Sequence, residues 1–238
     1  MITLYPYETL GHANHGWLDA RHHFSFASYR NPKRVGFGSL LVINDDTVAA
    51  GRGFSSHPHD NMEIITYVRQ GAITHKDSMG NIGRTAAGDV QVMSAGTGVF
   101  HSEYNAESED TRLYQIWIEP NELGVAPRWK AQQFPKQPVQ GTLPVLVSGQ
   151  AQHAGGQALF IHADAAIYGG VLAAGSTVKQ PLKHQGAYLL VSVGEVAVGG
   201  VAMKAGDGAE LLGEDVVTIT AATDAEVLLI DVPHRQRH

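Results

Sequence analysis

Short apolar runs separated by turn residues fill the chain from Gly38 onward. In the first half, runs of strand length cover Leu40–Asn44, Met62–Val68, Val90–Met93 and Arg112–Ile118. The corresponding runs of the second half are Val145–Val147, Ala158–His162, Tyr188–Val193, Val196–Val198, Ala209–Leu212, Val216–Thr220 and Glu226–Val232. Closely spaced strands with almost no helical periodicity predict an all-β fold, either a sandwich or a barrel.

Clusters of Gly, Asn and Asp lie between several of these runs. Asn44–Asp46, Ser78–Asn81 and Ala87–Asp89 all have this composition. These residue types favour tight turns, because they tolerate the backbone angles that a hairpin requires. The sequence therefore predicts that the chain reverses direction at each of these clusters.

Potential metal ligands occur in two pairs, each separated by one residue. The first pair is His57 and His59, and the second is His101 and Glu103. On a strand, residues i and i+2 point to the same face, so each pair projects together. If the two strands are neighbours, three imidazoles and a carboxylate converge on one point. Such a set of nitrogen and oxygen ligands suits Fe(II), Mn, Ni, Cu or Zn.

A further carboxylate, Glu63, follows the first pair closely. If the strand continues without a bulge, Glu63 shares the face of His57 and His59. It is then either a fourth ligand or a carboxylate that holds an imidazole in the correct tautomer. The spacing alone leaves both roles open.

The spacing also resembles the two cupin motifs. The first comprises Gly51, His57, His59, Glu63 and Gly71, and the second comprises Gly88, Ser94, Gly96, His101 and Asn105. The first motif has one extra residue before its closing glycine. The second has two extra residues before its histidine, and a serine where most cupins have proline. These departures resemble the pirin branch, whose signature continues through His23–Ala27, Thr66–Val68, His75, Asp77–Ser78, Gly80–Asn81, Gly88–Gln91, Met93, Ala95–Gly96, Gly98 and His101–Glu103. The chain resembles pirin-family bicupins, most of all bacterial members with quercetinase activity.

The pirin resemblance implies a metal held by His57, His59, His101 and Glu103, and favours Glu103 over Glu63 as the carboxylate ligand. It implies Fe(II), with Cu, Ni, Mn, Co or Zn as other divalent ions. The implied activity is a dioxygenase that opens a flavonol such as quercetin with O2, with Glu103 as the catalytic base. Because some pirins are partners of regulatory proteins, a metal-binding regulatory or interaction protein is the alternative. A metal-free epimerase is disfavoured by the ligand set.

Proline and glycine concentrate between residues 120 and 142, which predicts a linker. The predicted domains are therefore 1–135, which binds the metal, and 136–238. Arg128–Lys130, within the linker, could be helical or extended. The resemblance implies that both domains are β-barrel or jelly-roll cupins.

An internal repeat supports a second copy of the same fold. Gly71–Thr74 and Ala86–Val90 resemble Gly194–Ala197 and Lys204–Gly208. Aligned on this repeat, the ligand positions fall near Gln180–Leu182 and within Val216–Thr220, where the ligand set is missing. The C-terminal domain is therefore expected to be structural, and one chain with two domains makes a monomer plausible.

The remaining histidines are interpreted as structural. His12, His15, His22 and His23 are expected to pack an N-terminal arm, although some could line the mouth of the pocket. In the second half, the histidines interpreted as incidental are His153, His162, His184, His234 and His238.

Charge and composition exclude several classes of protein. The formal net charge is -6 with no basic run, which argues against nucleic-acid binding. The chain has no cysteine, which excludes disulfides and thiolate metal sites. Neither a signal peptide nor an apolar run of membrane-spanning length is visible. The sequence predicts a soluble cytoplasmic protein without a membrane or nucleic-acid partner.

Overall fold

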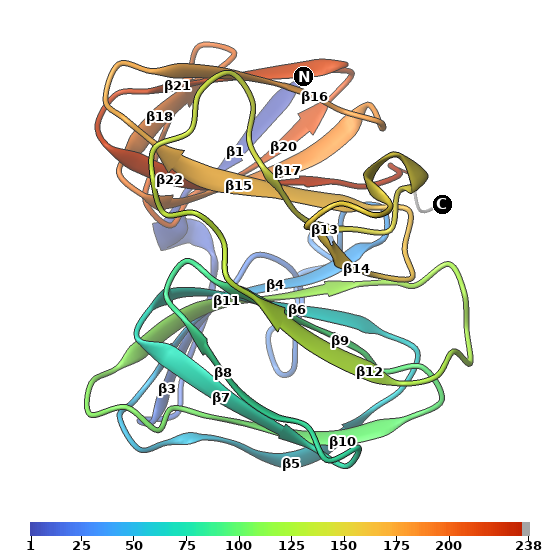
Figure 1. Ribbon diagram of the computed structural model, residues 1–238. Helices are drawn as coiled ribbons and strands as arrows, with labels where there is room; N and C mark the ends of the chain where they lie inside the picture. Colours follow the sequence, from blue (N-terminus) through green and yellow to red (C-terminus); the bar gives the residue numbers. More distant parts are fainter. Residues whose placement is uncertain (235–238) are drawn as a thin grey trace.

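The computed structural model describes residues 1–234, which form two stacked β-sandwiches (Figure 1). The N-terminal sandwich contains β2 (Gly11–Asn14), β3 (Leu18–His22), β4 (Leu40–Val48), β5 (Gly53–His59), β6 (Glu63–Gln70), β7 (Ala72–Asp77), β8 (Ile82–Ala86), β9 (Val90–Ser94), β10 (Val99–Tyr104), β11 (Thr111–Ile118) and β12 (Arg128–Gln132). Its large sheet has the order β12-β9-β6-β11-β4-β3-β2, and its small sheet has the order β5-β10-β7-β8.

The C-terminal sandwich repeats this plan. It contains β1 (Ile2–Tyr5), β13 (Val145–Ser148), β14 (Leu159–Phe160), β15 (Ala166–Leu172), β16 (Thr177–Pro181), β17 (Gly186–Val193), β18 (Glu195–Val198), β19 (Val201–Lys204), β20 (Gly208–Leu212), β21 (Val216–Ala221) and β22 (Ala225–Asp231). The sheet orders are β1-β20-β17-β22-β15-β13-β14 and β16-β21-β18-β19. Two short 3-10 helices, η1 (Tyr7–Thr9) and η2 (Ala151–His153), complete the described elements.

The all-β architecture with two jelly-roll units is thereby confirmed. The internal repeat is visible in the sheets, since β9-β6-β11-β4 corresponds in order to β20-β17-β22-β15. The glycines of the repeat also correspond, because Gly71 and Gly194 adopt φ angles of 73° and 76°. A Cβ at Gly194 would lie 2.1 Å from the carbonyl oxygen of Asp224, so the turn requires glycine. No helix among residues 1–234 has the length and apolarity needed to cross a bilayer.

In each large sheet, one edge strand lies far along the sequence from the strand beside it. β1 pairs with β20, so the start of the chain belongs to the C-terminal sandwich. β12 pairs with β9, with Trp129 opposite Met93, so Arg128–Lys130 is extended. The division into 1–135 and 136–238 stays a prediction, and β1 is a strand that crosses it.

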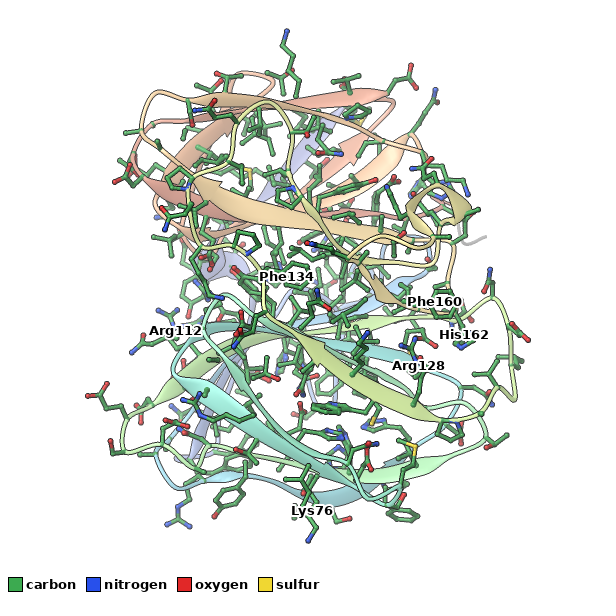
Figure 2. All side chains as sticks on the ribbon, in the orientation of Figure 1. Lys76, Arg112, Arg128, Phe134, Phe160 and His162 are labelled. Atoms are coloured by element: carbon green, nitrogen blue, oxygen red, sulfur yellow. The ribbon has the colours of Figure 1, made fainter. Side chains whose placement is uncertain are left out.

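The two large sheets pack against each other and form the principal core. Side chains alternate along β6, so Ile65 and Tyr67 point toward the C-terminal sandwich, where Leu190 and Ile230 belong to the same apolar cluster. Figure 2 shows Phe134 between the two sandwiches, and Arg128 donates a hydrogen bond of 2.8 Å to the carbonyl of Phe160. The opposite face of the N-terminal large sheet is therefore free to line a pocket.

Two of the three predicted turns are confirmed and one is wrong. Ser78–Asn81 and Ala87–Asp89 connect β7 to β8 and β8 to β9. Asn44–Asp46 lies instead in the middle of β4. Its polar side chains have partners that a turn does not provide: Asn44 bonds His22, and Asp45 pairs with Arg69. Tertiary contacts override the local turn preference at this position.

Candidate metal centre

Three of the four predicted metal ligands meet at one point between β5 and β10. His57 and His59 lie on β5, and the register places His101 of β10 opposite His57. One ligand atom from each of the three rings lies within 4.8 Å of the other two. The Nε2 atoms of His57 and His101 are 3.0 Å apart. The same-face argument from the sequence is therefore correct for the histidines.

Hydrogen bonds orient two of these rings. The Nδ1 atom of His57 is 2.7 Å from the carbonyl oxygen of Ser55, which can only accept, so Nδ1 carries the proton. His75 donates from Nε2 to Asp77 at 2.9 Å, which leaves its Nδ1 as an acceptor 3.4 Å from Nδ1 of His101. Both His57 and His101 then turn an Nε2 lone pair toward the centre of the cluster.

Burial favours the neutral form of two of the three imidazoles, His59 and His101. Burial lowers the pKa of His101 to about 3, and repulsion from His57, His59 and His75 adds to the effect. Burial lowers the pKa of His59 to about 4, with a further contribution from His57. Neutral imidazoles with converging lone pairs are the form that binds a cation. The donor set therefore fits a divalent metal ion.

Glu103 lines the same pocket but is anchored to the opposite sheet. Its Oε1 atom accepts hydrogen bonds from Nε2 of Gln91 at 2.7 Å and from Oγ1 of Thr66 at 3.1 Å. Its Oε2 atom accepts one from Nε2 of Gln115 at 2.5 Å. Burial raises the pKa of Glu103, which is only 3% exposed. Its role as a fourth ligand stays a prediction, because the compact group comprises His57, His59 and His101.

A row of polar side chains crosses the large sheet and faces the histidines. We call these residues the cross-strand polar row: Gln91, Thr66, Gln115, Asn44 and His22. Each is directly opposite the next on β9, β6, β11, β4 and β3. Of these residues, only His22 had an expected role, in packing the N-terminal arm or lining the mouth of the pocket. The available signal was a polar residue inside an otherwise apolar strand, as at Gln115.

Glu63 lies outside this site. The chain turns between β5 and β6, with Asn61 at a φ of 42°, so the strand that carries His57 and His59 ends before Glu63. Glu63 accepts a hydrogen bond of 2.7 Å from Ser94, while its neighbour Ile64 lines the pocket. Burial raises the pKa of Glu63 to about 7. The expectation of a shared face is wrong, because its condition, an uninterrupted strand, is not met.

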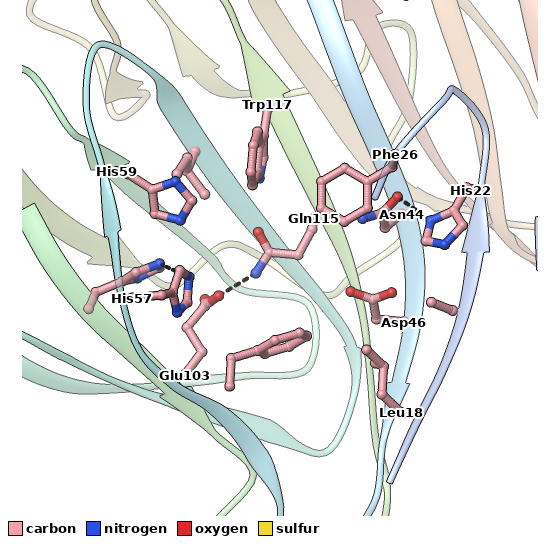
Figure 3. A pocket seen from close by; sticks show the side chains of 14 residues that line it. Leu18, His22, Phe26, Asn44, Asp46, His57, His59, Glu103, Gln115 and Trp117 are labelled. Atoms are coloured by element: carbon pink, nitrogen blue, oxygen red, sulfur yellow. Dashed lines mark hydrogen bonds between the residues drawn. The ribbon is translucent and has the colours of Figure 1, made fainter. Parts of the chain in front are cut away.

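The histidine cluster and Glu103 open into a pocket of about 270 Å³ (Figure 3). Its lining residues are Leu18, Ala20, His22, Phe26, Asn44, Asp46, Phe54, His57, His59, Ile64, His101, Glu103, Gln115 and Trp117. Six of these side chains are apolar and form much of the pocket wall: Leu18, Ala20, Phe26, Phe54, Ile64 and Trp117.

The N-terminal histidines have different environments. His22 lines the pocket and bonds Asn44, so a purely structural interpretation is wrong for this residue. His23 instead bonds the hydroxyl of Tyr188. His12 bonds Asp19 near the surface, and His15 is exposed.

In the part of the C-terminal sandwich that the structure describes, other side chains occupy the positions of the histidine cluster. The inward pair Gln180 and Val217 occupies the position of His57 and His101, within the segments expected from the repeat. His153 bonds Ser148, His184 bonds the carbonyl of Asp164, and His162 lies 3.7 Å from Glu122. His234 stacks beside Phe37, and His238 lies outside the described residues. Among residues 1–234, the compact ligand group is confined to the N-terminal sandwich.

Comparisons with known proteins match both halves of the chain. A family model described as Pirin matches residues 5–118, and one described as Quercetinase C-terminal cupin domain matches residues 145–232. The chain is 53% identical to a pirin-like protein from Caulobacter vibrioides, over 97% of this chain and 99% of the relative. It is 45% identical to a quercetin 2,3-dioxygenase from Escherichia coli (strain K12), over 98% and 99% of the two chains.

A solved structure is similar along the whole chain. It is the crystal structure of the bacterial pirin YhhW from Escherichia coli in complex with nickel(II). The two structures have a TM-score of 0.90 and 41% sequence identity, with 99% of this chain and 100% of that chain covered. The similarity therefore extends over both sandwiches.

Proposed function

This chain belongs to the pirin family, and on that premise we propose that it is a metal-dependent dioxygenase that opens a flavonol such as quercetin with O2. The observation that carries the proposal is a compact cluster of three histidines at one side of a largely apolar pocket. We propose Fe(II) as the resident ion, with Cu, Ni, Mn, Co or Zn as substitutes. The nickel(II) complex of a relative supports a divalent ion.

The histidines His57, His59 and His101 would hold the ion, with Glu103 as the fourth ligand. When bound, the ion supplies Lewis-acid stabilisation of the negative charge on the substrate. The chain itself fixes the orientation of the imidazoles, since Ser55 and His75 occupy the Nδ1 atoms of His57 and His101. A preset ligand geometry reduces the reorganisation that binding requires.

Glu103 is the proposed catalytic base and takes the proton of the flavonol 3-hydroxyl. Burial raises its pKa, which brings a carboxylate closer to the range that is useful for proton transfer at neutral pH. Gln91, Thr66 and Gln115 hold the carboxylate in position. Its Oε2 atom accepts only one of these bonds and so retains a lone pair for the incoming proton. The flavonolate then reacts with O2, and the heterocyclic ring opens with release of CO.

The pocket walls suit a planar aromatic substrate. Trp117 contacts His59 edge-on at 5.0 Å and Phe26 at 5.4 Å between ring centroids. Leu18 and Ile64 add aliphatic surface. Apolar walls of this kind bind flat rings and keep water away from the reacting anion.

The test is anaerobic loading with Fe(II), followed by quercetin and O2, with loss of the flavonol absorbance as the readout. We expect turnover in the wild-type protein and none in His57→Ala. His162→Ala is the matched control, because His162 lies in the C-terminal sandwich beside Glu122. Turnover in an iron-free His57→Ala protein would contradict the proposed site.

Absence of flavonol turnover in iron-loaded wild-type protein would instead favour the regulatory alternative, a metal-dependent complex with a partner protein. We further propose a cytoplasmic location, in keeping with the cysteine-free sequence. A monomer is proposed because one chain supplies both sandwiches.

A further inference from the structure

Asp46 is a buried carboxyl group that has no assigned role in the proposed reaction. It lies in the middle of β4, is 2% exposed and lines the pocket. Its Oδ1 atom has no hydrogen-bond partner among the described residues. Figure 3 shows the carboxyl group turned into the cavity, on the side away from His57 and His59.

The neighbouring polar groups have partners. Asn44 is bonded to His22 at 2.7 Å, and Asp45, on the other face of β4, pairs with Arg69. Glu103 receives bonds from three donors, whereas Asp46 receives none at Oδ1. A buried carboxyl group without a partner is costly, and folded proteins rarely retain one without a reason.

The fold itself does not need this carboxyl group. Asn44, opposite Gln115, corresponds in the repeat to Tyr168, opposite Leu229. Asp46 lies two residues after Asn44 on β4, and Gly170 lies two residues after Tyr168 on β15. Gly170 therefore occupies the position that corresponds to Asp46. The same jelly-roll architecture forms in the C-terminal sandwich without a carboxyl group at this position.

The chemistry of Asp46 suits a neutral hydrogen-bonding group. Burial, followed by repulsion from Asp45 and Glu103, raises its pKa well above the ordinary value. A protonated carboxyl group offers one O–H donor and one carbonyl acceptor. It can therefore bond a phenolic hydroxyl in both directions.

We propose that Asp46 recognises the ligand by hydrogen bonding to a phenolic hydroxyl group at the side of the pocket opposite the histidine cluster. The inference rests on the proposed function, which supplies the metal-chelating end of the ligand. The chemical class is a polyphenol with two polar ends, a hydroxyl-ketone pair at the histidines and a ring hydroxyl at Asp46. The apolar walls accommodate the aromatic body between them.

The test compares two ligands that chelate metal in the same way. Quercetin has ring hydroxyls besides its hydroxyl-ketone pair, and 3-hydroxyflavone keeps the chelating pair alone. Both are titrated anaerobically against Ni(II)-loaded wild-type, Asp46→Leu and Asp46→Asn proteins, with the flavonol absorbance as the readout. In Asp46→Leu we expect the Kd of quercetin to rise about tenfold, because its hydroxyl loses a partner, while the Kd of 3-hydroxyflavone stays within about twofold.

Asp46→Asn keeps a donor and an acceptor, so we expect quercetin affinity within about threefold of wild type. We also expect the ligand-free Asp46→Leu protein to melt at no lower temperature than wild type, because the substitution removes an unpaired buried group. Equal loss of affinity for both ligands, or unchanged quercetin binding in Asp46→Leu, would overturn the proposed role of Asp46. Either result would leave the proposed dioxygenase activity standing.

A separate measurement of O2-dependent turnover distinguishes the two proposals. Flavonol binding that depends on Asp46, without turnover in iron-loaded protein, would overturn the dioxygenase and retain the recognition site. Wild-type protein that binds neither ligand would overturn both.

Discussion

The two sandwiches share one sheet topology and differ in what fills them. The first has the cross-strand polar row, which includes Gln91, Thr66, Gln115 and Asn44. At the same registers of the second, the side chains are Ala209, Leu189, Leu229 and Tyr168. These belong to a continuous apolar cluster. A jelly roll therefore does not need polar residues in its interior, and those of the first sandwich serve its pocket.

The difference also concerns hydrogen-bond satisfaction. Polar groups are tolerated in a buried row only when they have partners. In the first sandwich Glu103 supplies them, since it accepts bonds from Thr66, Gln91 and Gln115. In the second, the position of Glu103 is taken by Ile219, beside an apolar row. Ligand and supporting row are thus present together or absent together.

The largest effect is expected from removing one histidine of the cluster. His57→Ala should reduce the Ni(II) retained after desalting from about one ion per chain to nearly none, because only two imidazoles of the cluster remain. Gln180→Ala is the matched change at the equivalent position of the C-terminal sandwich, and should retain the ion. Elemental analysis measures both. Metal loss in Gln180→Ala would mean that the second sandwich contributes to binding.

The next effect concerns the proposed base. Glu103→Gln should lower turnover about a hundredfold or more while metal is retained, because an amide cannot take the hydroxyl proton. Glu63→Gln is the control, a buried carboxyl outside the pocket, and should turn over normally. Steady-state kinetics with matched metal content measures both variants. Near-normal turnover in metal-loaded Glu103→Gln would remove Glu103 from the chemistry.

A smaller effect on turnover is expected when a residue of the cross-strand polar row is replaced by the apolar residue at the same position of the C-terminal sandwich. Gln115→Leu copies Leu229 and removes one donor from Glu103, which should lower kcat/KM about tenfold. Losing a donor to the ionised form raises the pKa of Glu103 further. The acid limb of the pH profile of kcat/KM should therefore move to higher pH. An unmoved limb would indicate that Gln115 only fills space.

The smallest effect on activity is expected at Glu63, where stability should change instead. Burial raises the pKa of Glu63 to about 7, above its unfolded value of 4.5. Folding therefore favours the protonated form, and this contribution to stability is lost as pH rises from about 4.5 through 7. Glu63→Gln should gain stability relative to wild type between pH 5 and pH 8, as measured by urea denaturation. A constant difference across this range would contradict the burial argument.

Several parts of this molecule follow from local sequence patterns. The strands and two of the three turn clusters were predictable, because alternation and turn chemistry act over a few residues. The convergence of His57, His59 and His101 followed from the two-residue period of a strand. The missing ligands near Gln180 followed from the repeat. Separate family models match residues 5–118 and 145–232, one in each half of the chain.

Other parts depend on strand register and on contacts between distant residues. Asn44–Asp46 has the composition of a turn, yet partners on β3 and β6 keep it extended. Glu63 has the right parity for a ligand, but the turn at Asn61 places it on another strand.

By itself, the sequence determined the all-β fold, its repeat and the three histidines, since each depends on spacing within one short segment. Only the tertiary structure decided which residues support them. Gln91, Thr66 and Gln115 meet Glu103 because β9, β6 and β11 align in one register. Asp46 faces the same cavity from a fourth strand. Register depends on the hydrophobic pattern and the turns of all paired strands together, so one short segment of the chain does not reveal it.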